Sequence, residues 1–507
     1  MTILDIISGA QAVEEHRPWP RAVVGDEGWS RVIDELAAGR WTLSGLWGDA
    51  GVVHMAVIAE ASDIAVLSYR CQHGRFPSVG AKHPPAIRLE RAIASLFGYE
   101  PVGAPDTRPW LDHGRWGVGQ PLSSVVPQRR ETAGAGATDK YDFLPVEGEG
   151  LHQVPVGPVH AGIIEPGHFR FTANGEFVVR VEERLGYVHK GIESLMAGAP
   201  LERAAKLAGR ASGDSTVAYS FAFARVVEAA TQTAPPPRAV YLRALMAELE
   251  RLANHFGDIG AICNDASFAL MHAQTGILRE RVLRAAEACF GHRLMMDVVV
   301  PGGVACDLPE EGAATLRALL IEIRRVFPRL IELYDNTASL QHRTVTTGIV
   351  RPDYARRFGA GGHVGRAAGR NFDARRTPGY APYDTLQFEV PVLDAGDVNA
   401  RVWIRIREVE QSLSLIEQIL ARLPQGELRA SVAVNGPCEG MAYAEAFRGD
   451  VLVWLRLDGD GRVARCHLRD ASWFQWPLLE AAIENNIIAD FPLCNKSFNC
   501  SYSGHDL

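Results

Sequence analysis

The chain has 507 residues, of which 47% are hydrophobic and 22% are charged, and its formal net charge is −8. A chain of this length exceeds one ordinary hydrophobic core, so we expect two or more domains. The acidic balance and the absence of a basic run exclude a protein built to coat nucleic acid.

Residues 1 to about 120 predict a small α+β domain. Segment 41–60 alternates in hydrophobicity around a GDAG turn, which is typical of a β-hairpin. Segment 84–98 has apolar residues at helical spacing and ends at Gly98, which predicts a helix with a glycine stop. We therefore expect a hairpin and a helix to build most of this first domain.

The remainder of the chain predicts a large, mostly helical domain. Residues 121–150 show no sustained periodicity and are rich in Gly, Ala, Thr and Pro, which favours a linker, so the large domain is expected at 151–507. Its long amphipathic segments predict bundled helices at 238–265, 310–336 and 397–423, the last with Asp397 as N-cap. A β-hairpin is expected at 451–469, turning at 458–461.

The cysteines and the N-terminus indicate a cytoplasmic protein with reduced thiols. The eight cysteines form no CxxC pair, and their spacing fits neither a zinc ribbon nor a disulfide framework. The N-terminus lacks a charged region followed by an apolar stretch, and nowhere do about 18 apolar residues run uninterrupted. Membrane association is therefore expected only through partner proteins.

A set of motifs runs in order along the chain. In the first 120 residues they are "GRFPSV" (74–79) and "LERAIASLFGYEPVGAPDTRPW" (89–110). The later ones are "GPVHAGIIEPGHFRF" (157–171), "RLGYVHKGIESLM" (184–196), "ELERLANHFGDIGAICND" (248–265), "TTGIV" (346–350), "GRAAGRNFDAR" (365–375) and "EGMAYAEAFRGD" (439–450). In this order, over some 400 residues, they resemble the large subunit of the membrane-bound group 4 nickel–iron hydrogenases, of the formate hydrogenlyase and hydrogenase-4 kind.

That subunit in turn resembles a fusion of two peripheral-arm subunits of respiratory complex I. The resemblance implies an α+β fold, with a complex I smaller-subunit-like domain before a hydrogenase-large-subunit-like domain. It also implies an iron–sulfur small subunit that binds near the loops 157–171 and 209–219, and antiporter-like membrane subunits below. The complex would lie at the inner membrane. The family is often described in NADH dehydrogenase terms, but in complex I that activity belongs to flavin-holding subunits, and "PGGV" (301–304) does not open a dinucleotide site.

The four thiolates that hold nickel and iron in catalytic members are absent. In the first metal motif, after Arg210, their positions are taken by Ser212 and Ser215. In the C-terminal motif, matched to "NCSYSGHDL" (499–507), they are taken by Ser501 and Gly504. A hydroxyl is a hard ligand that stays protonated at neutral pH and glycine has no side chain, so we expect no metal centre and no cofactor bound by this chain. The chain also ends at Leu507 without the tail that catalytic members lose on maturation, which agrees with the absent thiolates and leaves open whether the C-terminus is processed.

The complex I branch, which also lacks these thiolates, uses the vacated space to reduce quinone. The resemblance therefore makes a quinone the candidate acceptor here, with six candidate catalytic residues: His160, Glu165, His168, Arg210, Asp214 and Tyr219. Histidine and tyrosine donate hydrogen bonds and protons, and an aspartate can orient a histidine. The spacing of the two histidines follows the hydrogenases, and no residue matches the tyrosine that complex I places beside its quinone.

Three functions follow from this comparison. In the first, the chain passes electrons between the partner's iron–sulfur cluster and a quinone-like acceptor, and a cavity joins the two histidines to Ser212 and Ser501. In the second, it is a non-catalytic structural or coupling subunit, Ser212 and Ser215 cap a helix, and Arg210 is an ion-pair partner. In the third, it is a hydrogenase with unusual nickel ligation, through Cys494 and Cys500.

Overall fold

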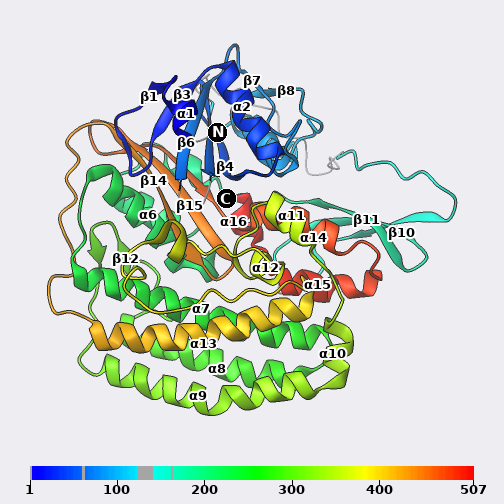
Figure 1. Ribbon diagram of the computed structural model, residues 1–507, viewed down its shortest axis with the longest axis vertical. Helices are drawn as coiled ribbons and strands as arrows, with labels where there is room; N and C mark the ends of the chain where they lie inside the picture. Colours follow the sequence, from blue (N-terminus) through cyan, green and yellow to red (C-terminus); the bar gives the residue numbers. More distant parts are fainter. Residues whose placement is uncertain (1–2, 60–62, 124–140, 162–163) are drawn as a thin grey trace.

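The computed structural model describes residues 3–59, 63–123, 141–161 and 164–507. Its N-terminal part lies over a layered body made of a sheet and a bundle of long helices, and a narrow three-stranded sheet projects from one side (Figure 1). Helices and sheets are both extensive and mostly separate along the chain, so the fold class is α+β, as predicted.

The N-terminal sheet has five strands in the order β1-β3-β6-β5-β4. The hairpin predicted at 41–60 is confirmed, since β4 (Trp41–Asp49) pairs antiparallel with β5 (Val52–Ala59). The predicted helix is also confirmed as α3 (Ile87–Phe97), which ends at Gly98 in the left-handed conformation. The other elements of this part are α1 (Ile3–Ile7), β1 (Gln11–Ala12), β3 (Arg21–Val24), α2 (Asp26–Ala37), β6 (Asp63–Arg70), β7 (Arg75–Pro77) and β8 (Glu100–Val102).

The N-terminal part and the body share a core. Strand β2 (His16–Arg17) pairs in parallel with β14 (Cys438–Ala446) and so becomes the edge of the four-stranded sheet β16-β15-β14-β2. Beside this junction, Arg21 forms a buried ion pair with Glu439 at 2.5 Å. One hydrophobic cluster also unites residues of the N-terminal sheet with residues from 169–185 and 473–502. The two predicted domains are therefore packed as one body.

Four long helices form the bundle at the base of the body (Figure 1). They are α7 (Pro237–Asp265), α8 (Ala269–Phe290), α9 (Gly312–Asn336) and α13 (Val398–Arg422), which confirms the three predicted helices. Asp397 caps α13 as predicted, because its carboxylate accepts a hydrogen bond from the amide of Ala400 at 2.7 Å. Above the bundle, α6 (Thr216–Thr231) packs under β14 and β15 (Gly449–Leu457).

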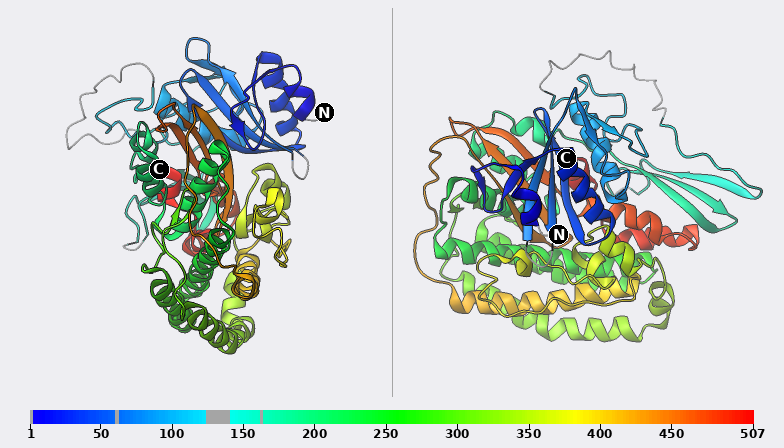
Figure 2. Two further views of the ribbon diagram at one scale, coloured as in Figure 1. Left: turned by 90° about the vertical axis from the view of Figure 1, so that its left-hand side faces the viewer. Right: turned by 45° about the horizontal axis from the view of Figure 1, so that its top comes forward.

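Two loops and the C-terminal segment lead to the site. The projecting sheet consists of β9 (Leu151–Val156), β10 (His168–Asn174) and β11 (Phe177–Arg184) and stands out from the body (Figure 2), and the first loop is the one between β9 and β10. The second loop joins α5 (Leu201–Ala208) to α6. The C-terminal segment carries α14 (Ser472–Ala482), α15 (Phe491–Phe498) and α16 (Tyr502–Asp506), after the predicted hairpin of β15 and β16 (Val463–Arg469), which is also confirmed.

The remaining elements are short. They are α4 (Ile192–Met196), β12 (Val299–Val300), β13 (Gly303–Val304), α10 (Ala338–Thr344), α11 (Pro352–Arg357) and α12 (Gly362–Ala367). In the predicted linker, residues 141–150 form no helix or strand, and residues 124–140 lie outside the described part of the chain. No helix among the described residues is both long enough and apolar enough to cross a membrane.

Candidate functional site

The residues at the four vacated ligand positions meet where the α5–α6 loop touches the C-terminal segment. The hydroxyl oxygens of Ser212 and Ser501, 289 residues apart in the sequence, lie 3.0 Å from each other. Ser501 is the N-cap of α16 and accepts a hydrogen bond from the amide of Gly504 at 2.8 Å. Ser212, Ser215 and Ser501 are each less than 5% exposed. Hydroxyl groups therefore occupy a buried junction between two distant motifs.

An ion pair between the buried Arg448 and the partly exposed Asp214 organises this junction. Both carboxylate oxygens of Asp214 accept hydrogen bonds from the guanidinium of Arg448, at 2.8 and 2.6 Å. The Asp214 carboxylate also accepts from the hydroxyls of Ser212 at 2.8 Å and Ser215 at 3.3 Å. Burial by itself raises the pKa of Asp214, but Arg448 and the two hydroxyls outweigh it and hold the pKa below its usual value. Asp214 is therefore a carboxylate, and Arg448 is a cation whose charge it balances.

The fourth position has no room for a side chain. A Cβ atom added at Gly504 would lie 2.7 Å from Oδ2 of Asp470 and 2.9 Å from Oγ of Ser501. The Asp470 carboxylate is held in place, because it accepts hydrogen bonds from the Tyr219 hydroxyl and from the amide of Ser472, both at 2.8 Å. Three hydroxyls, an ion pair and a filled fourth position do not fit a thiolate-held nickel–iron centre.

A cavity of about 350 Å³ opens beside the junction, and we call it the serine cavity. Of the six candidate catalytic residues, Glu165 and Asp214 line it, and Ser212 lines it as well. Its volume is in the range of small-molecule sites. The full lining is Ile164, Glu165, Ser212, Gly213, Asp214, Arg448, Asn495, Lys496, Asn499, Cys500, Tyr502 and Ser503.

His160 reaches the serine cavity through a tyrosine that sequence reasoning missed. The Tyr502 hydroxyl lies 3.5 Å from Nε2 of His160. Burial lowers the pKa of His160, helped by the charge of Lys496, and burial raises the pKa of Tyr502. A neutral imidazole therefore faces a protonated phenol. Tyr502 stands directly after Ser501 in the C-terminal motif, so its place in that motif could have identified it as a site residue.

Glu165 joins the β9–β10 loop to the C-terminal segment. Its carboxylate accepts a hydrogen bond from the amide of Ser503 at 3.2 Å. Residues 162–163 of the same loop lie outside the described part of the chain. The wall of the serine cavity is thus made by four segments that are far apart in sequence, the fourth contributing Arg448 from between β14 and β15.

Four candidate residues lie outside the cavity lining, so the cavity does not join the two histidines as expected: His160 touches the lining residue Tyr502, and the other three have contacts of their own. His168 lies 3.3 Å from the carbonyl oxygen of Gly157 through Nδ1, and its Nε2 accepts a hydrogen bond from Arg170. Arg210 forms a two-point ion pair with Asp297, at 2.8 and 2.7 Å. Tyr219 is fully buried against Asp470.

The two cysteines considered as replacement ligands occupy different surroundings. Cys494 is buried near Gly348 and Arg401, and burial raises its pKa to about 11. Cys500 lines the serine cavity, with its sulfur 3.9 Å from Oε1 of Gln475, and burial raises its pKa well above the usual value. Protonated thiols are poor metal ligands. Among the described residues, no three His, Cys, Asp or Glu side chains group together in a way that could hold a metal ion.

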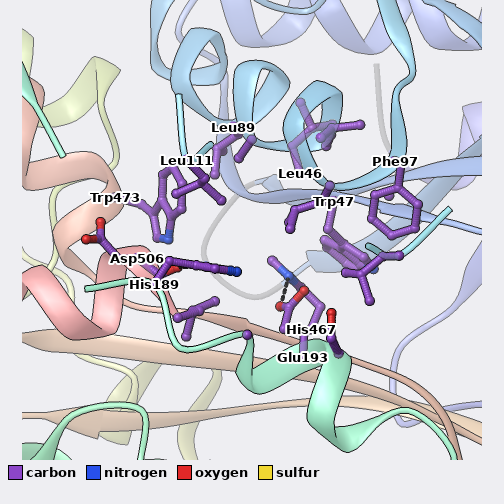
Figure 3. A pocket seen from close by; sticks show the side chains of 18 of the residues that line it. Leu46, Trp47, Leu89, Phe97, Leu111, His189, Glu193, His467, Trp473 and Asp506 are labelled. Atoms are coloured by element: carbon purple, nitrogen blue, oxygen red, sulfur yellow. Dashed lines mark hydrogen bonds and ion pairs between the residues drawn. The ribbon is translucent and has the colours of Figure 1, made fainter. Parts of the chain in front are cut away.

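A second cavity, of about 30 Å³, lies at the seam between the N-terminal part and the C-terminal end (Figure 3). Apolar side chains of α3 and β4, such as Leu89 and Leu46, face it from one side. On the other side, His467 is bonded through Nδ1 to the Glu193 carboxylate at 2.8 Å. This space is close to the size of one water molecule, so it is a packing gap rather than a substrate site.

Comparison with known proteins places this geometry in a family. Residues 267–436 match the family described as "Respiratory-chain NADH dehydrogenase, 49 Kd subunit". The chain is 31% identical to formate hydrogenlyase subunit 5 of Escherichia coli over 85% of its own length and 77% of the relative's. It is also 31% identical to an NADH-quinone oxidoreductase subunit of Desulfotalea psychrophila, over 66% of its own length and 91% of the relative's.

A solved structure of the archaeal membrane-bound sulfane sulfur reductase, a respiratory membrane complex, shares the fold. The TM-score is 0.67 at 24% identity, and the match covers 72% of this chain and all of the other one. This similarity supports only the fold of the chain.

Proposed function

The chain belongs to the oxidoreductase family that includes formate hydrogenlyase subunit 5 and the matching subunit of NADH-quinone oxidoreductase, and on that premise we propose that it reduces a quinone-like acceptor in the serine cavity. In this proposal it is the large subunit of a membrane-associated complex and receives electrons from an iron–sulfur cluster in a partner small subunit. Antiporter-like membrane subunits complete the complex.

The observation that carries the proposal is the pairing of Tyr502 with His160 at the wall of the serine cavity. Reduction of a quinone to a quinol takes two electrons and two protons and forms two O–H bonds. The Tyr502 hydroxyl is the proton donor to one quinone oxygen, and neutral His160, with Nε2 3.5 Å away, donates a hydrogen bond to the phenol oxygen and so stabilises the phenolate until water in the cavity returns its proton. Arg448 favours the negative charge that develops on the acceptor before the proton arrives.

The test uses the complex purified with its native partners and a soluble quinone analogue. Tyr502→Phe removes one hydroxyl and keeps the ring, so we expect the rate of quinol formation to fall by about 10²-fold, the usual scale for a lost general acid. Tyr334→Phe is the matched control, because Tyr334 is also buried and donates its hydroxyl to Asn399 at 2.7 Å, but it does not line the serine cavity. Equal rates for both variants would refute the role of Tyr502.

A structural or coupling role is the second candidate. The tight contacts of His168, Arg210 and Tyr219 favour it, since each of these side chains already has a structural partner. This function predicts that reduction of the partner's cluster produces no quinol in the unmodified complex. Nickel analysis of the same sample tests the remaining candidate, and we expect nickel at background because the residues at the four ligand positions do not fit the metal.

A further inference from the structure

A third cavity, of about 90 Å³, lies next to the serine cavity, and Asp214 lines both. We call it the Glu250 cavity. It is lined by Asp214, Leu249, Glu250, Ala253, Asn254, Arg279, Val282, Leu283, Ala286, Arg293, Leu294 and Met295. A space of this size holds water when polar groups face it, and here a carboxylic acid, an amide and two guanidinium groups do.

Glu250 is a buried carboxyl group that caps the helix carrying the serine motif. Its two oxygens accept hydrogen bonds from the amides of Val217 at 2.7 Å and Ala218 at 3.1 Å, in the first turn of α6. The residue is 8% exposed. Within the described residues, no cation lies within ion-pair distance of this carboxyl group. Charges buried without a partner are costly, so the structure favours its protonated form.

The surrounding charges agree with this view. Burial raises the pKa of Glu250 to about 8, and the negative charge of Asp214 adds to the effect. The two amide hydrogen bonds and Arg251 on the same helix act in the opposite direction. Arg279 of α8 and Arg293 complete the charged groups that face the Glu250 cavity. Glu250 therefore exchanges its proton close to physiological pH.

Hydrogen bonds link this region to the serine cavity. The side-chain amide of Asn254 donates to the backbone oxygen of Asp214 at 2.8 Å and to that of Glu250 at 2.9 Å, which ties α7 to the serine motif. On the other side, the Asp214 carboxylate accepts from Ser212, and Ser212 lies 3.0 Å from Ser501. Among the described residues no hydrogen bond joins the Glu250 carboxyl group directly to the Asp214 carboxylate, but both residues line the Glu250 cavity, so water in that cavity can bridge them.

We propose that Glu250 supplies the second proton of the reaction, through water in the Glu250 cavity to Asp214 and then Ser212, and is itself reprotonated by water in the same cavity. This inference rests on quinone reduction in the serine cavity. Two electrons come from the partner's cluster, one proton comes from Tyr502, and one comes from Glu250. As charge develops on the acceptor, the Glu250 O–H bond breaks and an O–H bond forms on the second quinone oxygen, with Asp214 and Ser212 each passing one proton on.

The test is Glu250→Gln in the complex with its native partners, with the rate of quinol formation measured from pH 6 to 9. The unmodified complex should be active below about pH 8 and lose activity as Glu250 deprotonates. We expect the variant to form quinol at least tenfold more slowly at pH 7, with an unchanged KM. Its rate should not show the fall above about pH 8, which we call the alkaline limb. Glu250→Asp, which keeps a carboxyl group, should restore the alkaline limb and part of the rate of quinol formation.

Glu90→Gln is the matched control. Glu90 is also buried, accepts from the amides of Val79 and Gly80, and has its pKa raised by burial to about 7, but it lies in the N-terminal part and lines neither cavity. It should leave the rate and the pH profile unchanged. Infrared difference spectra should show a protonated carboxyl band that is absent only in Glu250→Gln.

The outcomes separate the two proposals. An unmodified complex that forms no quinol overturns both of them. Quinol formation with the same rate and alkaline limb in Glu250→Gln overturns the proton-supply inference and leaves quinone reduction standing. An equal loss in Glu90→Gln assigns the effect to stability and also overturns the inference.

Discussion

Replacing Gly504 by alanine tests whether the fourth ligand position is closed. The added Cβ would lie 2.7 Å from the Asp470 carboxylate and 2.9 Å from the Ser501 hydroxyl, and both distances are shorter than ordinary contacts. Relief requires that one of these groups move. Moving Asp470 weakens its hydrogen bond from Tyr219, of a kind worth about 1.5–3 kcal/mol when one partner is charged. Moving Ser501 weakens the cap of α16, worth about 1 kcal/mol.

We therefore expect Gly504→Ala to lower the free energy of unfolding by about 2 kcal/mol, within the range for overpacked sites. The measurement is a denaturant titration of the full chain followed by circular dichroism. Gly213→Ala is the matched control, because it lies in the same site, its backbone does not require glycine, and a Cβ there would meet nothing within 4 Å. We expect that change to stay within about 0.5 kcal/mol.

A Gly504→Ala variant as stable as the control would refute the reasoning. It would mean that Asp470 yields at no cost and that the position is open. In that case the variant with cysteine at all four positions, 212, 215, 501 and 504, should accommodate its thiols. If the position is closed, that variant should be less stable than the one with cysteine only at 212, 215 and 501.

Three further predictions concern buried charges. Asp214→Asn leaves the Arg448 guanidinium without its counter-charge and should lower the free energy of unfolding by about 1–3 kcal/mol. We expect the lower end of that range because the Asp214 side chain is 38% exposed, and a denaturant titration measures it. Arg21→Ala strands the buried Glu439 carboxylate, so amides of β2 and β14 should exchange hydrogen faster in mass spectrometry, and unchanged exchange would contradict the shared core. Because the folded chain binds the Glu250 proton more tightly than the unfolded chain does, its contribution is complete below about pH 4.5 and is lost as pH rises through about 8. The unfolding free energy should therefore fall across that window, by at most about 1.4 kcal/mol per pH unit, and Glu250→Gln should flatten the curve.

Local patterns were sufficient for the elements that depend on nearby residues. The leucines of segment 238–265 repeat at helical spacing, and Leu242, Leu245, Leu249 and Leu252 are all fully buried in α7. The cap at Asp397 and the hairpin at 41–60 follow equally from a few neighbouring residues. Each of these structures satisfies its own backbone or buries its own apolar face, so a short window contains the necessary information.

The sequence by itself also determined that positions 212, 215, 501 and 504 carry no thiol, since no folding can turn serine or glycine into a thiolate. Only the tertiary structure decided which side chains surround these positions. The Tyr502–His160 contact joins residues 342 positions apart, and the closure at Gly504 depends on Asp470, which no local pattern relates to it. The raised pKa of Glu250 likewise arises from burial beside Asp214. Distances between remote side chains and the loss of water around them come from packing, and packing exists only when the whole chain has folded.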